Sequence, residues 1–345
     1  MDHKFPYKWY LKDGYPAKGI EPNGLKVFGT FVCGGGSTMG YKLAGFDHMG
    51  GVEIDKEVAA VYQKNHKPKH FYNLDIRDFN KLDILPDELF DLDLLDGSPP
   101  CSTFSIAGSR EKAWNKKKKF REGQSEQTLD DLVFVYLNTI KKLKPKVALL
   151  ENVKGLMLGN AKGYLKEIHK RFTNIGYRVQ VFLLDASRMG VPQRRQRVFI
   201  IGLQNDFSLP KLVLKFCEND IFYKIIEDKK DLTEMDKSTK SYSLFMKTKI
   251  GDPFSKNDPK SNFFGYTKVD IKKVCSTVVS NHGTAQFHYK IFRKLNKKEL
   301  CQIGSYSMDY DFGTLMPKYL IGMSVPPVMT AQIANQINLQ WLSKI

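Results

Sequence analysis

The stretch FDLDLLDGSPPC, residues 90–101, decides the fold, because an apolar run typical of a buried strand ends there in two prolines and a cysteine. Pro99 and Pro100 have fixed φ angles and no backbone donors, so the chain cannot continue as an inner strand. A stiff turn therefore presents the thiol of Cys101 at a strand end, where it is suited to attack an electrophilic carbon. The alternative is a small buried hydrophobe, which is what most free cysteines are.

A second strand-like run, residues 147–150, ends in Glu151-Asn152-Val153. The carboxyl ends of parallel strands line one crevice, so we expect Cys101 and Glu151 to face the same ligand although they are far apart in sequence. A thiol and a proton-donating carboxyl would then share a site. Taken singly, Glu151 is better explained as a surface carboxylate or as a partner for Lys144 and Lys146.

Further apolar runs alternate with segments of helical periodicity as far as Leu203, for example over residues 132–143 and 164–175. This alternation predicts an α/β fold with a mostly parallel, doubly wound sheet and crossover helices. A chain of 345 residues that is 42% hydrophobic can also bury a second, smaller core. The sequence therefore predicts two domains.

A glycine-rich turn, Cys33-Gly34-Gly35-Gly36, follows the strand-like run 25–32. Glycines let a backbone approach a ligand closely. The next such run, residues 49–54, closes with Glu53 and is followed by Asp55, where an acid can accept hydrogen bonds from ribose hydroxyls. The spacing departs from G-x-G-x-x-G and lacks G-K-[ST], which favours an adenosine site without phosphates over a dinucleotide site or a P-loop.

Two more polar groups lie at expected strand boundaries. Asp75 follows the run 71–74 and could bind an adenine amino group or simply form a turn. The basic stretch Gln193-Arg194-Arg195-Gln196-Arg197 precedes the run 198–202. Phosphate binding or a solvated basic strand end would also explain these arginines.

Taken in this order, the motifs resemble those of the DNA cytosine-5 methyltransferase family, of the bacterial or phage restriction-modification type, over nearly the whole chain. The residues that carry the resemblance are Phe31–Gly36, Glu53 with Asp55, Asp75, Ser98–Ser105, Glu151–Val153, Val191–Gly202, Arg293–Leu295 with Glu299, and Tyr319–Met329. Two stretches depart from the family pattern. The usual arginine-glycine pair appears as Arg121-Glu122-Gly123, and Gly322-Met323-Ser324 replaces Gly-Asn-Ala before Val-Pro-Pro.

The resemblance implies transfer of a methyl group from S-adenosyl-L-methionine to C5 of a cytosine flipped out of duplex DNA, through a covalent adduct of Cys101 at C6. It also implies that Glu151 donates or shares a proton at N3 and that Asn152 orients the Glu151 loop. Arg195 and Arg197 would fix the nucleophile loop and the base carbonyl O2. The cofactor-binding residues that the resemblance implies are Phe31, Gly34, Gly35, Gly36, Glu53, Ile54, Asp75, Pro99 and Ser324.

By the same resemblance, residues 1–204 form the catalytic and cofactor-binding domain and residues 205–317 form the target-recognition domain. Residues 318–345 return to the catalytic domain. The basic segment 105–127 would close over the flipped base, although a solvated lysine run is the alternative.

Composition agrees with a polyanionic partner, because 54 Lys and Arg against 37 Asp and Glu give a net charge of +17. We expect double-stranded DNA, bound with a steep salt dependence, although acidic membranes would also attract such a chain. No apolar segment approaches a bilayer span and none resembles a signal peptide, so a cytoplasmic enzyme is expected. Five widely spaced cysteines without C-x-x-C predict neither a disulfide framework nor a metal site. One complete set of site residues per chain favours a monomer, and a cognate restriction endonuclease would act separately.

Three other functions would explain part of the sequence. A tRNA cytosine-5 methyltransferase shares the Pro-Pro-Cys and Glu-Asn-Val chemistry, but the large variable region and the lack of a Cys-Phe-Thr tripeptide argue against it. A catalytically silent DNA-binding module would not need intact Cys101, Glu151, Arg195 and Arg197. A dinucleotide-dependent oxidoreductase leaves the Pro-Pro-Cys and arginine motifs unexplained.

Overall fold

The computed structural model describes residues 4–100, 132–158, 161–258, 263, 265–281 and 283–345. Its main sheet has seven strands in the order β3-β2-β1-β4-β5-β7-β6. In chain order these are β1 (Lys26–Thr30), β2 (Asp47–Val52), β3 (His70–Tyr72), β4 (Leu94–Gly97), β5 (Val147–Val153), β6 (Tyr177–Asp185) and β7 (Gln196–Gln204). The strands from β3 to β5 are parallel, whereas β7 runs antiparallel to β5 and β6. The predicted mostly parallel α/β sheet is confirmed.

Successive side chains of each strand point to opposite faces of the sheet. Both sets are apolar here, so helices cover both faces. Val27 and Leu94 enter one core, and their neighbours Phe28 and Leu95 enter the other. The helices of the first face are α1 (Gly36–Leu43), α2 (Lys56–His66) and α10 (Pro327–Gln340), and those of the second are α3 (Ile76–Lys81), α4 (Leu132–Leu143) and α5 (Ala161–Asn174). The sheet is thus doubly wound.

The strand-like run predicted for residues 90–95 is a strand only from Leu94 onward. Residues 87–90 form a 3-10 helix instead. Asp93 is buried before the strand begins, where its carboxylate accepts hydrogen bonds from the backbone N–H of Lys26 at 2.7 Å and from Lys146 Nζ at 2.8 Å. Together with backbone hydrogen bonds from Asp93 to Lys26 at 3.0 Å and from Val147 to Asp93 at 2.9 Å, these contacts fix the entry to β4.

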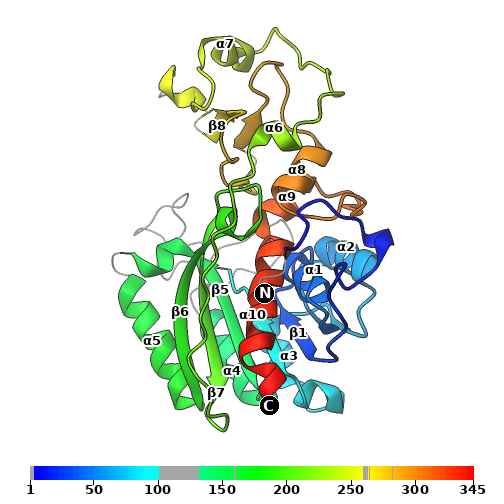
Figure 1. The fold of residues 1–345 in the computed structure, drawn as a ribbon, viewed down its shortest axis with the longest axis vertical. Helices are drawn as coiled ribbons and strands as arrows, with labels where there is room; N and C mark the ends of the chain where they lie inside the picture. The colour runs from blue at the N-terminus through cyan, green and yellow to red at the C-terminus, as the bar shows by residue number, and fades with distance from the viewer. Residues whose placement is uncertain (1–3, 101–131, 159–160, 259–262, 264, 282) are drawn as a thin grey trace.

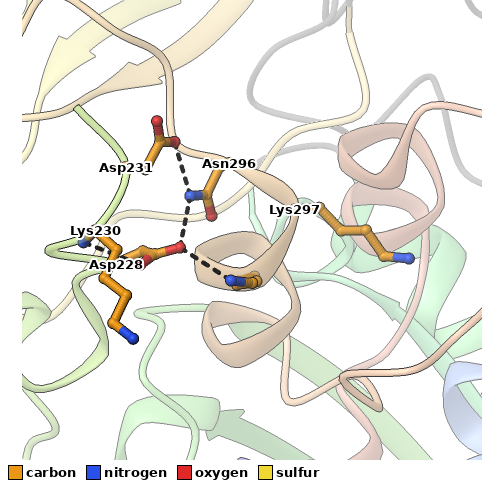
Figure 2. Close-up of a pocket in the computed structure, with 6 residues that line it drawn as sticks. Asp228, Lys230, Asp231, Asn296 and Lys297 are labelled. Carbon is orange, nitrogen blue, oxygen red and sulfur yellow. Dashed lines mark hydrogen bonds and ion pairs between the residues drawn. The ribbon is translucent and has the colours of Figure 1, made fainter. Parts of the chain in front are cut away.

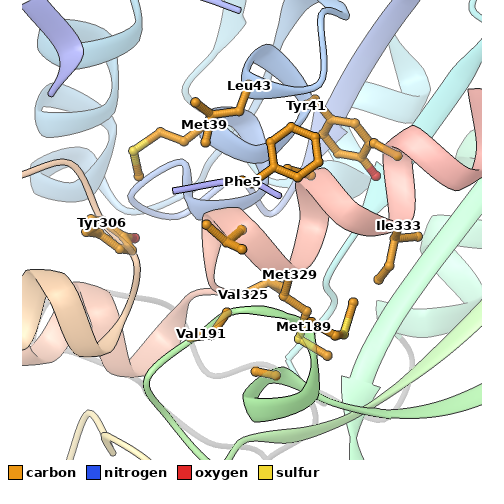
Figure 3. Packing of buried hydrophobic residues seen from close by; sticks show 14 of the residues in the cluster. Phe5, Met39, Tyr41, Leu43, Met189, Val191, Tyr306, Val325, Met329 and Ile333 are labelled. Carbon is orange, nitrogen blue, oxygen red and sulfur yellow. The ribbon is translucent and has the colours of Figure 1, made fainter. Parts of the chain in front are cut away.

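Helix α10 lies against α1 near the centre of the molecule, so the last helix of the chain contacts the first (Figure 1). Gly40 of α1 permits this approach, since a Cβ there would lie 2.5 Å from the carbonyl oxygen of Pro327. Met39 of α1 and Met329 and Ile333 of α10 belong to the buried cluster between the two helices and the sheet (Figure 3). The C-terminal segment therefore packs beside the glycine turn that begins α1.

Two helices that follow strands of the sheet begin at an aspartate, a residue type that is favoured at helix N-termini. Asp55 caps α2 by accepting hydrogen bonds from the backbone N–H groups of Glu57 and Val58, and Asp75 caps α3 by accepting one from Arg77. Such caps satisfy donors that have no partner within the helix. Both acids that follow strands β2 and β3 are thereby placed at fixed positions.

A separate lobe lies above the sheet in Figure 1 and holds α7 (Lys240–Lys247), β8 (Gly265–Lys268) and β9 (Thr284–Phe287). Strands β8 and β9 pair in parallel. Phe245, Phe254, Phe287 and Phe292 form its small aromatic core, which is distinct from the two cores of the main sheet. Three short helices, α6 (Tyr223–Ile226), α8 (Lys297–Ile303) and α9 (Pro317–Met323), lie between this lobe and the sheet.

A buried charge network holds the base of this lobe. Glu299 of α8 is fully buried and accepts hydrogen bonds from both terminal nitrogens of Arg293, at 2.8 and 2.9 Å, and from the Tyr223 hydroxyl at 2.6 Å. These hydrogen bonds hold the pKa of Glu299 below its ordinary value although burial acts in the opposite direction. The carboxylate thus joins α6 and α8 as an ion.

Asn296 extends the network to the surface. It caps α8 in a capping box with Glu299, and its amide donates to Asp228 at 3.2 Å and to Asp231 at 2.9 Å (Figure 2). The open pocket in Figure 2 is lined by these residues together with Lys230, Lys297 and Lys298. The carboxylates of Asp228 and Asp231 already accept hydrogen bonds from Asn296. We therefore assign the pocket to the junction between the upper lobe and the sheet.

No helix among the described residues is long and apolar enough to cross a membrane.

Replacing the buried carboxylate should weaken this junction strongly. Glu299→Gln removes the charge that pairs with the buried Arg293 guanidinium at 2.8 Å and leaves the weaker pair with Asp231 at 3.8 Å, and breaking a buried pair typically costs about 3–5 kcal/mol. We expect a loss of about 3 kcal/mol in urea unfolding followed by tyrosine and tryptophan fluorescence. Glu167→Gln, which removes an exposed ion pair with Arg171 on α5, is the matched control and should change stability by less than about 1 kcal/mol. Equal effects of the two substitutions would contradict the prediction.

Candidate active site

Five parallel strands end in one row at the same edge of the sheet. The paired positions are Thr30 with Val52, Val52 with Tyr72, Thr30 with Gly97, and Gly97 with Leu150. The chain leaves this row through residues that include Phe31, Glu53, Ser98 and Glu151. The order of connections reverses between β1 and β4, and ligands bind at such a switch point in open α/β sheets. The register therefore gathers most of the predicted site residues at one edge.

Glu151 and Arg197 form an ion pair at this edge, with 2.9 Å between Arg197 Nε and Glu151 Oε1. The antiparallel pairing of β5 with β7 brings them together, since Val153 lies opposite Arg197. Burial raises the pKa of Glu151, while the charges of Arg197 and Arg195 and the hydrogen bonds from Ser98 and Arg197 oppose the rise. The result is a carboxyl that holds a proton more readily than an exposed glutamate and is fixed by a cation.

Arg195 is almost fully buried and serves a different purpose from Arg197. Its terminal nitrogens donate to two backbone carbonyl oxygens, that of Val278 at 3.1 Å and that of Gly322 at 2.9 Å. Its Nε has no hydrogen-bond partner among the described residues. Arg195 thus ties the start of β7 to the segment that connects β8 with β9 and to the end of α9.

Asn152 connects the end of β5 to the turn that follows β4. Its Nδ2 donates to the carbonyl oxygen of Pro99 at 3.4 Å, and its Oδ1 accepts from the backbone N–H of Val153 at 2.8 Å. The side chain is buried. Cys101, the predicted nucleophile, and the basic segment 105–127 lie outside the described residues. The described part of the turn therefore ends at Pro100, beside Asn152.

The glycine turn after β1 has an unusual backbone. Phe31 and Cys33 have φ angles of 56° and 48°, in the left-handed region that residues with side chains rarely adopt, and Gly35 has a φ of 74°. Glu53 supports the turn, because its two carboxylate oxygens accept hydrogen bonds from the backbone N–H groups of Cys33 and Asp55, each at 2.9 Å. The predicted ribose-binding acid is thus oriented by the loop that it faces.

The C-terminal segment forms the other wall of this turn. A Cβ on Gly36 would lie 2.3 Å from the carbonyl oxygen of Val325 and 2.7 Å from Cβ of Ser324, so only glycine fits. Ser324 is buried, and its hydroxyl accepts a hydrogen bond from the Tyr306 hydroxyl. Of the residues predicted to bind a cofactor, Gly36 and Ser324 are therefore in direct contact.

Asp75 and Ile54 lie farther along the same edge. The Asp75 carboxylate pairs with Arg77 at 3.1 Å in addition to capping α3. Asp75 therefore has a structural role as a helix cap and ion-pair partner. Ile54 is 38% exposed and presents apolar surface next to Glu53.

Asp96 is a residue that the sequence analysis did not identify. It lies on β4 five residues before Cys101, is buried, and accepts a hydrogen bond from the Tyr41 hydroxyl of α1 at 3.2 Å. Burial, together with the negative charge of Glu151, raises the pKa of Asp96 to about 7. A carboxyl inside an otherwise apolar strand run is a signal that the sequence does contain.

Asp96 should make stability depend on pH. Between its ordinary pKa near 3.8 and about 7, the folded chain holds a proton on Asp96 that the unfolded chain has lost. Its contribution to stability is therefore greatest in acid and falls as pH rises through this range, by up to about 1.4 kcal/mol per pH unit. Asp96→Asn removes this pH-dependent loss of stability. The melting temperature of Asp96→Asn minus that of the wild type should therefore increase from pH 5 to pH 8.

Differential scanning calorimetry of the two proteins at several pH values measures this difference. Asp78→Asn, at an exposed ion pair on α3, is the control and should give a nearly pH-independent difference. The assignment fails if Asp96→Asn behaves in the same way as this control.

Solved structures with this fold come from distant proteins. A prophage-encoded protein of E. coli described as a DNA modification methyltransferase matches 92% of this chain and 99% of its own, with a TM-score of 0.67 and 18% identity. A DNMT2 variant of Spodoptera frugiperda matches 91% of this chain and 99% of its own, with a TM-score of 0.62 and 16% identity. The fold is therefore one that methyltransferases use.

The family follows from the sequence match. The model of the C-5 cytosine-specific DNA methylases matches residues 25–339, so this chain belongs to that family. The chain is similar to the Type II methyltransferase M.Bsp6I of Bacillus sp. (strain RFL6), at 29% identity over 91% of this chain and 98% of the relative. The similarity to the Type II methyltransferases M.FnuDI of Fusobacterium nucleatum and M.NgoPII of Neisseria gonorrhoeae, at 32% identity each, covers 59% and 55% of this chain and about half of those relatives, 54% and 52%. The family resemblance predicted from the motifs is confirmed.

Proposed function

We propose that this chain is a sequence-specific DNA cytosine-5 methyltransferase that takes its methyl group from S-adenosyl-L-methionine. The observation that carries the proposal is the Glu151–Arg197 ion pair, held at the end of β5 in a row of strand ends that also includes the glycine turn and the turn before Cys101. A carboxyl that retains a proton beside a nucleophile is what addition to a cytosine ring requires. Membership of the C-5 cytosine-specific DNA methylase family supports the same reaction.

The residues of the glycine turn fit an adenosine that bears an amino acid. Glu53 faces the turn with lone pairs left for ribose hydroxyls, and Ile54 offers exposed apolar surface for the adenine ring. Asp75 would accept a hydrogen bond from the adenine amino group. Phe31, Gly34, Gly35, Gly36, Pro99 and Ser324 would line the remainder of the site. The bound cofactor supplies an electrophilic methyl group.

The catalytic roles follow from the chemistry of cytosine, whose C5 is too electron-poor to accept a methyl group directly. The thiolate of Cys101 would add to C6, and Glu151 would give or share its proton at N3, which moves electron density to C5. Arg197 would hold Glu151 and the base carbonyl O2. Asn152 would keep the turn before Cys101 against the end of β5, and Arg195 would hold the start of β7 in place through the carbonyl oxygens of Val278 and Gly322.

Double-stranded DNA is the proposed partner, with the target cytosine flipped into the site because a stacked base cannot reach it. The net charge of +17 supports binding to a polyanion. We divide the chain into a catalytic and cofactor-binding domain over residues 1–204, a target-recognition domain over 205–317 and a returning segment over 318–345. The separate aromatic core of the upper lobe supports this division. We further propose a monomer that acts on cellular DNA in the cytoplasm, with any cognate restriction endonuclease acting as a separate protein.

Base-resolution mapping of 5-methylcytosine tests the activity. DNA from cells that express the wild-type chain should be methylated at one short sequence word, and DNA from cells that express Cys101→Ala should not. Unmodified DNA with both chains would contradict the proposal. Assay of tRNA from the same cells then tests the tRNA cytosine-5 methyltransferase, and binding of the mapped DNA without methylation would indicate a silent binding module.

Removing the proton of Glu151 should separate chemistry from cofactor binding. Glu151→Gln keeps the shape of the side chain but cannot deliver a proton to N3, so kcat should fall by about 100-fold to 10,000-fold. Transfer of a radiolabelled methyl group to duplex DNA measures this rate, and calorimetry with S-adenosyl-L-methionine should give a dissociation constant within about twofold of wild type. An unchanged kcat would remove Glu151 from the mechanism.

A further inference from the structure

The carbonyl oxygen of Gly34, in the middle of the glycine turn, is held by two side chains from other parts of the chain. The Tyr310 hydroxyl donates to it at 2.7 Å. His66 Nε2, at the end of α2, contacts it at 3.3 Å. Both side chains are buried. A single peptide group of the turn thus has two buried donors aimed at it.

His66 can act here only as a neutral donor. A carbonyl oxygen accepts but never donates, so the proton of the ring lies on Nε2. Nδ1 is buried and has no hydrogen-bond partner among the described residues. Burial lowers the pKa of His66 to about 3, and the charge of Lys42 acts in the same direction. The contact with Gly34 therefore does not change with pH near neutrality.

The ring of His66 also packs directly under the turn. A Cβ on Gly35 would lie 2.1 Å from His66 Nε2, so this position requires glycine for space as well as for its φ of 74°. Phe31 and Cys33 have unfavourable positive φ angles in the same turn. Such a backbone persists only where the surroundings hold it. Glu53 holds it from one side, and His66 and Tyr310 hold it from the other.

We propose that Tyr310 and His66 are positioning residues, which fix the peptide after Gly34 so that the turn keeps the shape needed to bind S-adenosyl-L-methionine. The inference rests on the proposed function, because it takes this turn to be the cofactor site. Neither residue belongs to the motifs that carried the family resemblance. Tyr310 lies in the connection between α8 and α9, so the turn is held by the part of the chain that follows the target-recognition lobe.

The N-terminal arm, residues 4–24, supports Tyr310 in turn. Trp9 Nε1 donates to the carbonyl oxygen of Ser305 at 3.0 Å, and the backbone N–H of Met308 donates to the carbonyl oxygen of Trp9 at 2.9 Å. Asp309, next to Tyr310, accepts hydrogen bonds from the backbone N–H groups of residues 11 and 12, at 2.7 and 3.1 Å. The arm precedes the family match, which begins at residue 25. It therefore adds a second layer of support that is outside the matched region.

Removal of one hydroxyl tests the proposal. Tyr310→Phe deletes the 2.7 Å hydrogen bond to Gly34 and keeps the buried ring. Tyr177→Phe is the matched control, because the Tyr177 hydroxyl is also buried and donates to a backbone carbonyl oxygen, that of Pro145, at 2.6 Å, away from the glycine turn. Three quantities are measured for each protein: the melting temperature, the dissociation constant for S-adenosyl-L-methionine by calorimetry, and amide hydrogen exchange of residues 32–40.

Tyr310→Phe should raise the dissociation constant by about fivefold to tenfold, the range expected for one lost hydrogen bond. It should also speed amide exchange in residues 32–40. Tyr177→Phe should leave both within about twofold of wild type even where the two variants lower the melting temperature equally. If Tyr310→Phe and Tyr177→Phe changed the dissociation constant and the amide exchange to the same extent, whether weakly or strongly, the positioning role would be overturned.

Two further variants extend the test. His66→Gln places an amide donor near the position of Nε2 and should retain more cofactor affinity than His66→Leu, which has no donor. Asp309→Ala should raise the dissociation constant by about twofold to fivefold, because it removes two of the hydrogen bonds that join the arm to the segment before Tyr310. Wild-type protein that binds no S-adenosyl-L-methionine would refute the proposed function, whereas unchanged exchange of residues 32–40 in Tyr310→Phe would refute the positioning role alone.

Discussion

The in-register pairing of the parallel strands is the constraint on which the site depends. Side chains of a strand alternate between faces, so a shift of one residue in any strand would exchange its two buried sets and move its end out of the row. The two cores prevent such a shift, because Val27 and Phe28 must enter different cores and so must Leu94 and Leu95. The hydrophobic pattern therefore sets the stability of the fold, and it also places Glu53 and Glu151 just beyond the parallel pairing of their strands.

Sequence predicts those parts of the structure that depend on local pattern. The helices expected at residues 132–143 and 164–175 appear as α4 and α5, since their apolar spacing has the helical period and little competes with it. The acids after β2 and β3 lie where the motifs placed them, whereas β7 begins at Gln196, so Arg197 lies inside the strand that the sequence predicted to begin at residue 198. Strand ends that carry polar residues after apolar runs were sufficient to predict one edge of a parallel sheet as the site.

Pairing between distant segments could not be predicted in the same way. The run 198–202 indicates a strand, but its direction in the sheet is set by tertiary contacts, and the antiparallel orientation of β7 is what brings Arg197 to Glu151. The start of β4 at Leu94 depends on Asp93 meeting Lys26 and Lys146. Asp96, His66 and Tyr310 gain their importance from burial and from partners far away in the chain. No local pattern distinguishes His66 and Tyr310 from ordinary polar residues, whereas the position of Asp96 inside an apolar strand run is visible in the sequence.

Among the described residues, the Arg195 guanidinium donates hydrogen bonds to the carbonyl oxygens of Val278 and Gly322 and to no side chain. Every amino acid carries such an oxygen, so the contact at position 278 makes no demand on the identity of the residue there. Segments of very different sequence can therefore be joined to the sheet through the same arginine. This attachment would let recognition segments be exchanged or diverge between homologous chains while the geometry around Glu151 stays constant.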